Sequence, residues 1–155
     1  LWIIKNISIP KKQNLDICLE KIVIKVVFSN YYPEITSPIV ESINTQLSEV
    51  NDLISNTLFT EVSGVWEIPY TINSSTSDVR YFIAVGAIIK GETDHYEYIS
   101  NSVSNALMNI TINKNVYISN CILNLHNSAQ GIPRSKTKGL EAVNALLNVI
   151  NNDNS

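Results

Sequence analysis

Four apolar segments set the strongest limit on how this chain can fold. Each is rich in Val, Ile and aromatic residues and runs apolar almost without interruption, which is typical of strands that are buried on both faces of a sheet. The segments are Ile22–Phe28, Leu58–Val62, Tyr81–Ile89 and Val116–Leu123. We therefore predict four buried strands.

Helical patterns lie between these strands. Ser37 is a plausible N-cap, and Pro38 fits the first helical position after it. A third helix is expected to begin near Asp94 and a last one after Gly139, whereas residues 67–80 have room only for a brief helix. The apolar residues that we expect to face the core recur at helical spacing: Ile39, Ile43, Leu47 and Val50, then Ile99, Val103, Leu107 and Ile110, and finally Leu140, Val143, Leu147 and Ile150.

Strands that alternate with helices predict an α/β domain with a parallel sheet and right-handed crossovers. The 155 residues suit a single domain of three layers, in which a four-stranded parallel sheet is flanked by helices. We expect the last segment, residues 151–155, to be frayed. Ligands of such folds bind outside the carboxyl ends of the strands, which selects the loops over residues 29–36, 63–69, 90–98 and 123–134.

The composition argues against several classes of function. Hydrophobic residues make up 45% and charged residues 16% of the chain, and the net charge is -3 without a basic block, which argues against a nucleic-acid partner. No apolar run reaches the roughly 18 residues of a membrane span, and we expect no signal peptide at the start. Cys18 and Cys121 lack metal-ligand spacing, so we expect reduced thiols in a cytoplasmic protein.

The segment KGETDH, residues 90–95, combines groups that can bind an anion and move a proton. Gly91 permits a close backbone approach, the next residues begin a helix with free N–H groups, and Thr93 adds a hydroxyl donor. His95 would lie beside the anion, where a neutral imidazole can accept and donate protons near pH 7. The plainer alternative is a strand-ending glycine, a helix cap at Thr93 or Asp94 and a solvated histidine.

Aromatic and acidic residues follow two other strands. Tyr31 and Trp66 could stack on a planar ring, and Glu67 could bond a donor-rich heterocycle or cap the short helix. His126 lies in an Asn-rich loop and is interpreted as a loop residue. Each feature is unspecific alone, but a ring platform beside an anion site and a neutral histidine favours one functional site at this edge of the sheet.

Three stretches resemble the 6,7-dimethyl-8-ribityllumazine synthase family, and they occur in the family's order. AVGAIIKGETDHYEYIS, residues 84–100, is similar to the signature G-A-V-I-R-G-E-T-x-H-F-D-Y. GVWEIP, residues 64–69, is similar to G-A-F-E-I-P, and KGLEAVNALL, residues 138–147, is similar to the N-K-G-x-E-A-A helix start. The similarity extends over nearly the whole chain from about Ile22.

The resemblance implies a flavodoxin-like fold and a transferase of riboflavin biosynthesis. The family condenses 5-amino-6-ribitylaminouracil with 3,4-dihydroxy-2-butanone 4-phosphate, and releases the lumazine, phosphate and water without a cofactor or metal. It forms cytoplasmic homopentamers, sometimes twelve of them in a hollow shell, with the active site between neighbouring subunits. In the family, the N-terminal arm, here residues 1–20, often adds a strand to the adjacent subunit's sheet.

The resemblance also implies a role for each matching residue. His95 matches the histidine that shuttles protons, and Tyr31 falls where the family has the aromatic that stacks on the pyrimidine. The residues implied to bind phosphate are Gly91, Glu92, Thr93 and Arg134. The residues implied to line the ring and ribityl pocket are Val65, Trp66, Glu67, Ile88, Ile89 and Lys90. The residues implied to come from the adjacent subunit are Asn120 and Lys138.

The chain departs from the family pattern at two loops. The family's R-F-N-x-x-I corresponds to NYYPEI, with Tyr32 where Asn is expected. After the fourth strand the chain is shorter by about one helical turn and contains Pro133. A different placement of this deletion puts Gln130 at the arginine position, and Arg134 or Lys136 must then substitute.

These departures leave two other functions open. One is a non-catalytic, pentameric protein of the same fold that binds a flavin or lumazine or serves in assembly, which the altered arginine loop favours and the intact GETDH segment disfavours. The other is the archaeal-type riboflavin synthase, which shares the fold. Its reaction has no phosphate substrate, so the KGET segment disfavours it.

Overall fold

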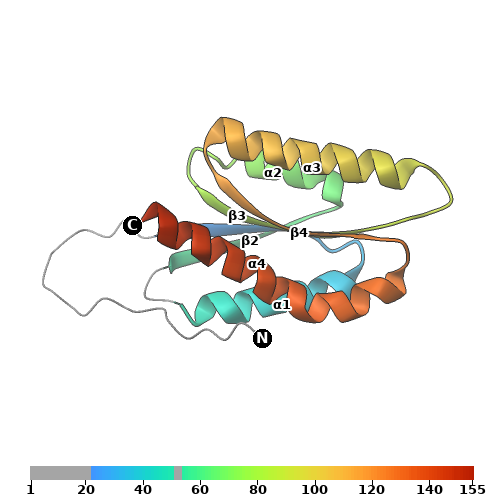
Figure 1. Ribbon diagram of the computed structural model, residues 1–155, viewed down its shortest axis with the longest axis horizontal. Helices are drawn as coiled ribbons and strands as arrows, with labels where there is room; N and C mark the ends of the chain where they lie inside the picture. Colours follow the sequence, from blue (N-terminus) through green and yellow to red (C-terminus); the bar gives the residue numbers. More distant parts are fainter. Residues whose placement is uncertain (1–21, 51–53) are drawn as a thin grey trace, which may run out of the picture.

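The computed structural model describes residues 22–50 and 54–155 as a parallel sheet with helices on both faces (Figure 1). The strands are β1 (Ile22–Ser29), β2 (Ile54–Val62), β3 (Tyr81–Ile89) and β4 (Tyr117–Leu125), in the spatial order β2-β1-β3-β4. Every pairing between neighbouring strands is parallel. All four predicted strands are present, and the predicted three-layer α/β fold is confirmed.

The two edge strands are longer than predicted. β2 begins at Ile54 rather than Leu58, and β4 continues to Leu125. Exposed polar residues such as Asn56 and Asn124 interrupt the apolar run at these ends. Because the prediction depended on continuous apolar runs, it found the bounds of the fully covered β3 and shortened the strands that face solvent.

Helices cover the sheet in two pairs, one on each face. α1 (Pro33–Ser48) and α4 (Gly131–Asp153) lie on one face, and the short α2 (Ile68–Asn73) and the long α3 (His95–Lys114) cover the other (Figure 1). Successive residues of β3 serve the two cores in turn: Ile83 and Val85 pack under α1 and α4, whereas Phe82 and Ala84 pack under α2 and α3. β3 therefore contributes side chains to the hydrophobic cores on both faces of the sheet.

α1 begins at Pro33, earlier than the Ser37 cap and Pro38 start that we predicted. The carbonyl of Tyr32 accepts two backbone N–H groups of the first turn at 3.0 Å each, and Pro33 lies where a missing N–H costs no helical bond. Pro38 instead lies inside the helix on its exposed side, where water can bond the carbonyl that it leaves unpaired.

α4 begins at Gly131, not after Gly139 as predicted. Pro133 is in the first turn, where its missing N–H has no helical partner to lose. Gly139 is buried within the helix and allows close packing on α1, because a Cβ there would lie 2.8 Å from the carbonyl oxygen of Ile39.

The buried face of α4 also differs from the predicted stripe. Val143 and Ile150 face the core as expected, but Leu140 is 38% exposed and Leu147 is only partly buried. The core contacts are completed instead by Ala142 and Leu146. Near Gly139, α4 packs against α1 through a small residue. This contact was not predicted, because the prediction considered only large apolar residues.

The C-terminal end of α4 is held to the sheet. The helix continues through Asp153, whose Oδ2 accepts a hydrogen bond from the Tyr81 hydroxyl at 2.9 Å and lies 3.3 Å from Arg80 Nη2. Residues 151–153, which we expected to be frayed, thus belong to α4 in the structure. No helix in the described ranges is both long and apolar enough to cross a membrane. The N-terminal arm, residues 1–20, with Cys18, lies outside the described residues.

Candidate active site

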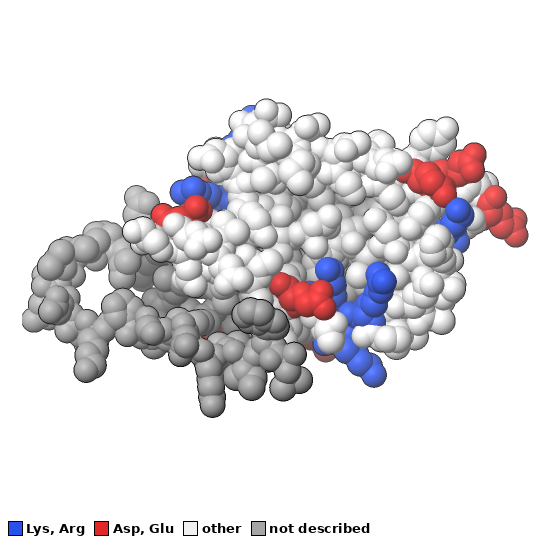
Figure 2. Space-filling model, viewed as in Figure 1, with Lys and Arg blue, Asp and Glu red and all other residues white. Residues whose placement is uncertain are grey.

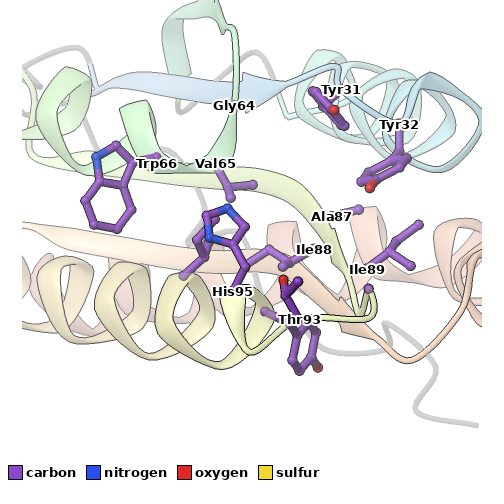
Figure 3. A pocket seen from close by; sticks show the side chains of 13 residues that line it. Tyr31, Tyr32, Gly64, Val65, Trp66, Ala87, Ile88, Ile89, Thr93 and His95 are labelled. Atoms are coloured by element: carbon purple, nitrogen blue, oxygen red, sulfur yellow. The ribbon is translucent and has the colours of Figure 1, made fainter.

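A cavity of about 340 Å³ lies at the carboxyl edge of the sheet, where β1, β2 and β3 end (Figure 3). Its walls come from the loops after these strands, the last residues of β3 and the first turns of α3. The lining residues are Tyr31, Tyr32, Gly64, Val65, Trp66, Ala87, Ile88, Ile89, Gly91, Thr93, His95, Tyr96 and Ile99. Three of the four predicted loops therefore meet at one site, as the parallel strand directions require.

The cavity combines a mostly apolar wall with a few polar groups. Trp66 lies on one side and Tyr31 and Tyr32 on the other, with His95 and Thr93 at the space between them (Figure 3). Apolar walls with a small number of placed polar groups are typical of sites for small organic ligands.

The floor of the cavity depends on a glycine in β3. A Cβ on Gly86 would lie 2.5 Å from Val65 Cγ1, so only glycine lets the turn Val65–Glu67 pack directly on the strand. Val65 is buried there, and the next residue, Trp66, is 59% exposed. The GVWEIP segment thus buries its valine as an anchor and presents its tryptophan to the cavity.

The N-terminus of α3 reaches the cavity without a side-chain cap. Asp94 is the N-cap residue, as the sequence predicted, but its carboxylate bonds no N–H group of the first turn. The side-chain cap by Thr93 or Asp94, which the plainer alternative required, is therefore absent from this helix. The carboxylate of Glu97 interacts with its own N–H group, so in the first turn the N–H groups of His95 and Tyr96 are the ones left to an external acceptor.

Gly91 is not required by the folding of its own loop. No described glycine has a positive φ, and a Cβ built on Gly91 would meet nothing within 4 Å. Neither turn geometry nor packing within the described part of the chain explains a glycine here. Gly91 lines the cavity, and the space beside its backbone is open.

His95 is the first residue of α3 and lines the cavity. Its side chain is exposed and makes no hydrogen bond or ion pair within the described residues. The imidazole is therefore free to exchange protons with a bound molecule, which a histidine that is locked in a hydrogen-bond network could not do without breaking a bond.

Lys90 lies behind the cavity wall rather than on it. Its Nζ is 2.8 Å from Glu97 Oε1 and 5.9 Å from the centre of the Tyr96 ring. This hydrogen bond lowers the pKa of Glu97 and raises the pKa of Lys90. The pair joins the end of β3 to the first turn of α3, and so it spans the loop that carries Gly91.

The loop after β4 touches the same wall from outside. The rings of His126 and Tyr96 lie 6.2 Å apart, and the His126 N–H donates to Gln130 Oε1 at 2.9 Å. His126 does not line the cavity. It lies beside Tyr96, which does.

Besides Lys90, two predicted site residues lie outside the cavity lining although neighbours of theirs belong to it. Glu67 is exposed and borders a separate, shallow surface hollow with Glu61 and Tyr70. Glu92 is exposed in the loop before α3. Both belong to segments that form the cavity, but neither is one of its lining residues.

Three more predicted residues lie on other surfaces. Asn120 is exposed on the edge strand β4, where its Oδ1 accepts the Ile122 N–H at 3.0 Å. Lys138 lies on α4, 3.4 Å from Glu141 Oε2, and Arg134 is exposed one turn earlier. Basic side chains gather over the N-terminal half of α4, on the face of the sheet opposite α3 (Figure 2).

Sequence reasoning missed some of the cavity lining. The additional residues are Tyr32, Gly64, Ala87, Tyr96 and Ile99. Tyr32 and Tyr96 each follow a predicted site residue directly, which was a usable signal. Small and aliphatic residues such as Ala87 and Ile99 carry no chemical signal, since the same residues fill ordinary cores.

The described residues offer no reactive thiol and no metal cluster. Cys121 is fully buried, its thiol donates to the carbonyl of Lys138 at 3.6 Å, and burial raises the pKa of Cys121 to about 12. Residues 22–50 and 54–155 contain no group of three or more His, Cys, Asp or Glu side chains arranged to hold a metal ion.

The sequence was compared with known protein families and with individual proteins. The family model for 6,7-dimethyl-8-ribityllumazine synthase matches residues 21–154. A protein of that name from Buchnera aphidicola subsp. Baizongia pistaciae is 34% identical over 153 residues, which cover 95% of this chain and 91% of the relative. Namesakes from Wigglesworthia glossinidia brevipalpis and Methylobacillus flagellatus are 40% and 27% identical, over 58% and 91% of this chain and 62% and 96% of their own lengths. Since the family match includes every residue of the cavity, the chain belongs to the 6,7-dimethyl-8-ribityllumazine synthase family.

Proposed function

We propose that this protein is an active lumazine synthase that condenses 5-amino-6-ribitylaminouracil with 3,4-dihydroxy-2-butanone 4-phosphate in the cytoplasm. The observation that carries the proposal is the meeting, in one cavity, of an aromatic platform, an uncapped helix N-terminus and a free histidine. The non-catalytic alternative gains no support from the relatives, which carry the synthase name.

The phosphate of the butanone substrate would bind at the N-terminus of α3. The N–H groups of His95 and Tyr96 and the helix dipole would attract an anion, Gly91 leaves its backbone open to close approach, and Thr93 adds a hydroxyl donor. Glu92 would contribute through its backbone, because its carboxylate would repel a phosphate. Lys90 would act indirectly, since its ion pair with Glu97 holds the loop in place.

The pyrimidine substrate would occupy the apolar part of the cavity. Tyr31 would stack on the ring, and Val65, Ile88 and Ile89 would enclose it. Trp66 lies across the cavity from Tyr31, where the ribityl chain would extend (Figure 3). Glu67 would meet that chain only at the cavity's border beside Gly64.

His95 would move the protons that the condensation requires. The amino nitrogen of the pyrimidine adds to the ketone carbonyl, and water leaves as the imine forms. Loss of a C–H proton expels phosphate, the resulting enol becomes a second carbonyl, and attack by the ribitylamino nitrogen expels another water as the ring closes. An imidazole at the phosphate site can accept and return a proton at each step, and the cavity supplies proximity.

Asn120, Arg134 and Lys138 would complete the site of a neighbouring subunit. Arg134 and Lys138 are four residues apart and therefore share one side of α4, and neither lines the cavity of its own chain. A homopentamer with sites between subunits would bring these cations to a neighbour's phosphate, and pentamers could pack further into a shell. Native mass spectrometry tests the pentamer directly.

Lumazine formation from both substrates tests the function. The product is followed by absorbance and fluorescence against a protein-free blank, because the condensation also proceeds slowly without enzyme. We expect acceleration by the protein, and a fall in kcat of about ten- to a hundredfold in His95→Gln with little change in either KM. His126→Gln is the matched control and should stay within about twofold of the wild type, since His126 lies outside the cavity. A folded protein that reacts no faster than the blank would overturn the proposal.

A further inference from the structure

Two adjacent tyrosines line the cavity where the family pattern R-F-N-x-x-I has one aromatic residue. The ring centres of Tyr31 and Tyr32 lie 5.0 Å apart, and their planes meet at 77°. This edge-to-face geometry is attractive because the positive edge of one ring meets the negative face of the other. Both rings lie on the side of the cavity opposite Trp66 (Figure 3).

The two tyrosines are held to different degrees. Tyr31 is 70% exposed, so little of its ring contacts the rest of the chain. Tyr32 is half-buried and packs against the core under α1 and α4. Its carbonyl accepts the N–H groups of Ile35 and Thr36 and the Thr36 hydroxyl, at 3.0 Å each. Tyr32 is therefore fixed at both backbone and ring.

A stacking platform works best when it is already in position. An exposed aromatic side chain that moves between rotamers must be ordered when a ring binds, and that ordering weakens affinity. Contact with the fixed edge of Tyr32 restricts where the Tyr31 ring can lie before any substrate arrives.

We propose that Tyr32 is a positioning residue that pre-orders Tyr31 for stacking on the pyrimidine substrate. The inference rests on the proposed function, because it takes Tyr31 as the platform for that ring. It assigns a purpose to the tyrosine that stands where the family pattern has Asn, and it confines the effect to one of the two substrates.

The test replaces Tyr32 by Leu, which keeps apolar bulk against the core and removes the aromatic edge. In Tyr32→Leu, the KM for 5-amino-6-ribitylaminouracil is expected to rise about three- to tenfold, the range of an aromatic pair contact. The KM for the butanone phosphate and kcat should stay within about twofold. Tyr32→Phe retains the edge and should behave as the wild type. If Tyr32→Leu does not fold, Tyr32→Asn, which carries the residue of the family pattern, takes its place with the same expectation.

Tyr117→Leu is the matched control, because Tyr117 is also half-buried against the same core but lies at the opposite end of the sheet. It should leave both KM values unchanged. The decisive comparison adds Tyr32→Leu to Tyr31→Leu: if Tyr32 acts through Tyr31, its effect disappears in that background. An unchanged pyrimidine KM in Tyr32→Leu, an equal rise in Tyr32→Phe, or the same fold-change with and without Tyr31 would each overturn the inference.

Binding of the product lumazine, measured by its fluorescence, repeats the comparison without turnover. A dissociation constant that rises about three- to tenfold in Tyr32→Leu supports the inference even if the wild type is inactive, and an unchanged constant overturns it. Failure of the proposed function and failure of the inference are thus distinguishable.

Discussion

At the scale of single residues, Gly91 separates what a ligand requires from what folding requires. Its φ is ordinary and a Cβ would meet nothing, so Gly91→Ala should shift the thermal unfolding midpoint by less than about 2 °C. The added methyl group would occupy space where the phosphate approaches the backbone, and the KM for the butanone phosphate should rise about tenfold. Steady-state kinetics check this, with the pyrimidine KM as the internal control. An unchanged phosphate KM would place the phosphate elsewhere.

Residues with distinctive chemistry could be predicted as part of the site, and residues that act by shape could not. Thr93 and His95 were selected because hydroxyl and imidazole groups at a helix start imply anion and proton chemistry. Ala87 and Ile99 contribute by position in space, and their types are common in any core. Only the folded geometry distinguishes such residues from packing.

At the scale of elements, the contact between α1 and α4 depends on Gly139. A Cβ there would lie 2.8 Å from the backbone oxygen of Ile39 and 2.9 Å from Ser42 Cβ, so the two helices must separate to admit it. Gly139→Ala is expected to lower the free energy of unfolding by about 1–3 kcal/mol, although alanine is the better helix former. Urea unfolding at equal protein concentration measures this, with Gly91→Ala as the control. Equal midpoints would show that the helices adjust without cost.

The same glycine explains why the start of α4 was mispredicted. Glycine often ends a helix, and proline is usually excluded from a helix interior. The sequence therefore favoured a helix that begins after both Pro133 and Gly139. In the structure Pro133 is in the first turn and Gly139 is a packing contact. Strands were easier to predict, because near-continuous apolar runs depend on burial alone, whereas the meaning of a glycine or proline depends on its neighbours.

A second element-scale prediction concerns the contact of β3 with the end of α4. Burial and the hydrogen bond to Asp153 raise the pKa of Tyr81 above the usual 10.0. The folded state therefore keeps this proton to higher pH than the unfolded chain. The resulting stabilisation is complete below about pH 10 and is lost as pH rises through the folded value.

Tyr81→Phe should lower the free energy of unfolding at pH 8 by about 0.5–1.5 kcal/mol, the usual worth of one hydrogen bond. It should also remove part of the decline in stability that the wild type shows above about pH 10. Denaturant midpoints between pH 8 and pH 11 check both points. Tyr98→Phe, at a 71% exposed tyrosine, should follow the wild-type curve. Parallel curves for Tyr81→Phe and the wild type would contradict the assignment.

At the scale of the whole molecule, the proposed phosphate site and a group of basic side chains lie on different surfaces. No lysine or arginine lines the cavity, whereas Arg134, Lys136 and Lys138 gather on α4 across the sheet (Figure 2). A phosphate that is held only by a helix N-terminus and a hydroxyl lacks the cation that usually pairs with it. The sequence selected Arg134 for this role but could not say which subunit's cavity it serves, because one chain contains no geometry between copies.

Mixed assemblies of two variants decide between these arrangements. His95→Gln and Arg134→Ala subunits, each nearly inactive at low butanone phosphate, are co-expressed and isolated together. Suppose that His95 and Arg134 serve one site from different subunits. In a random assembly of equal amounts, half of all sites have an intact His95 and half have an intact Arg134, so about a quarter have both. Activity then returns toward a quarter of the wild type. His95→Gln mixed with Tyr31→Ala is the control, because both residues line one subunit's cavity and no mixture restores it. Activity no higher than the sum of the separate variants would mean that Arg134 does not complete a neighbour's site, and the cavity would then have to bind phosphate without it.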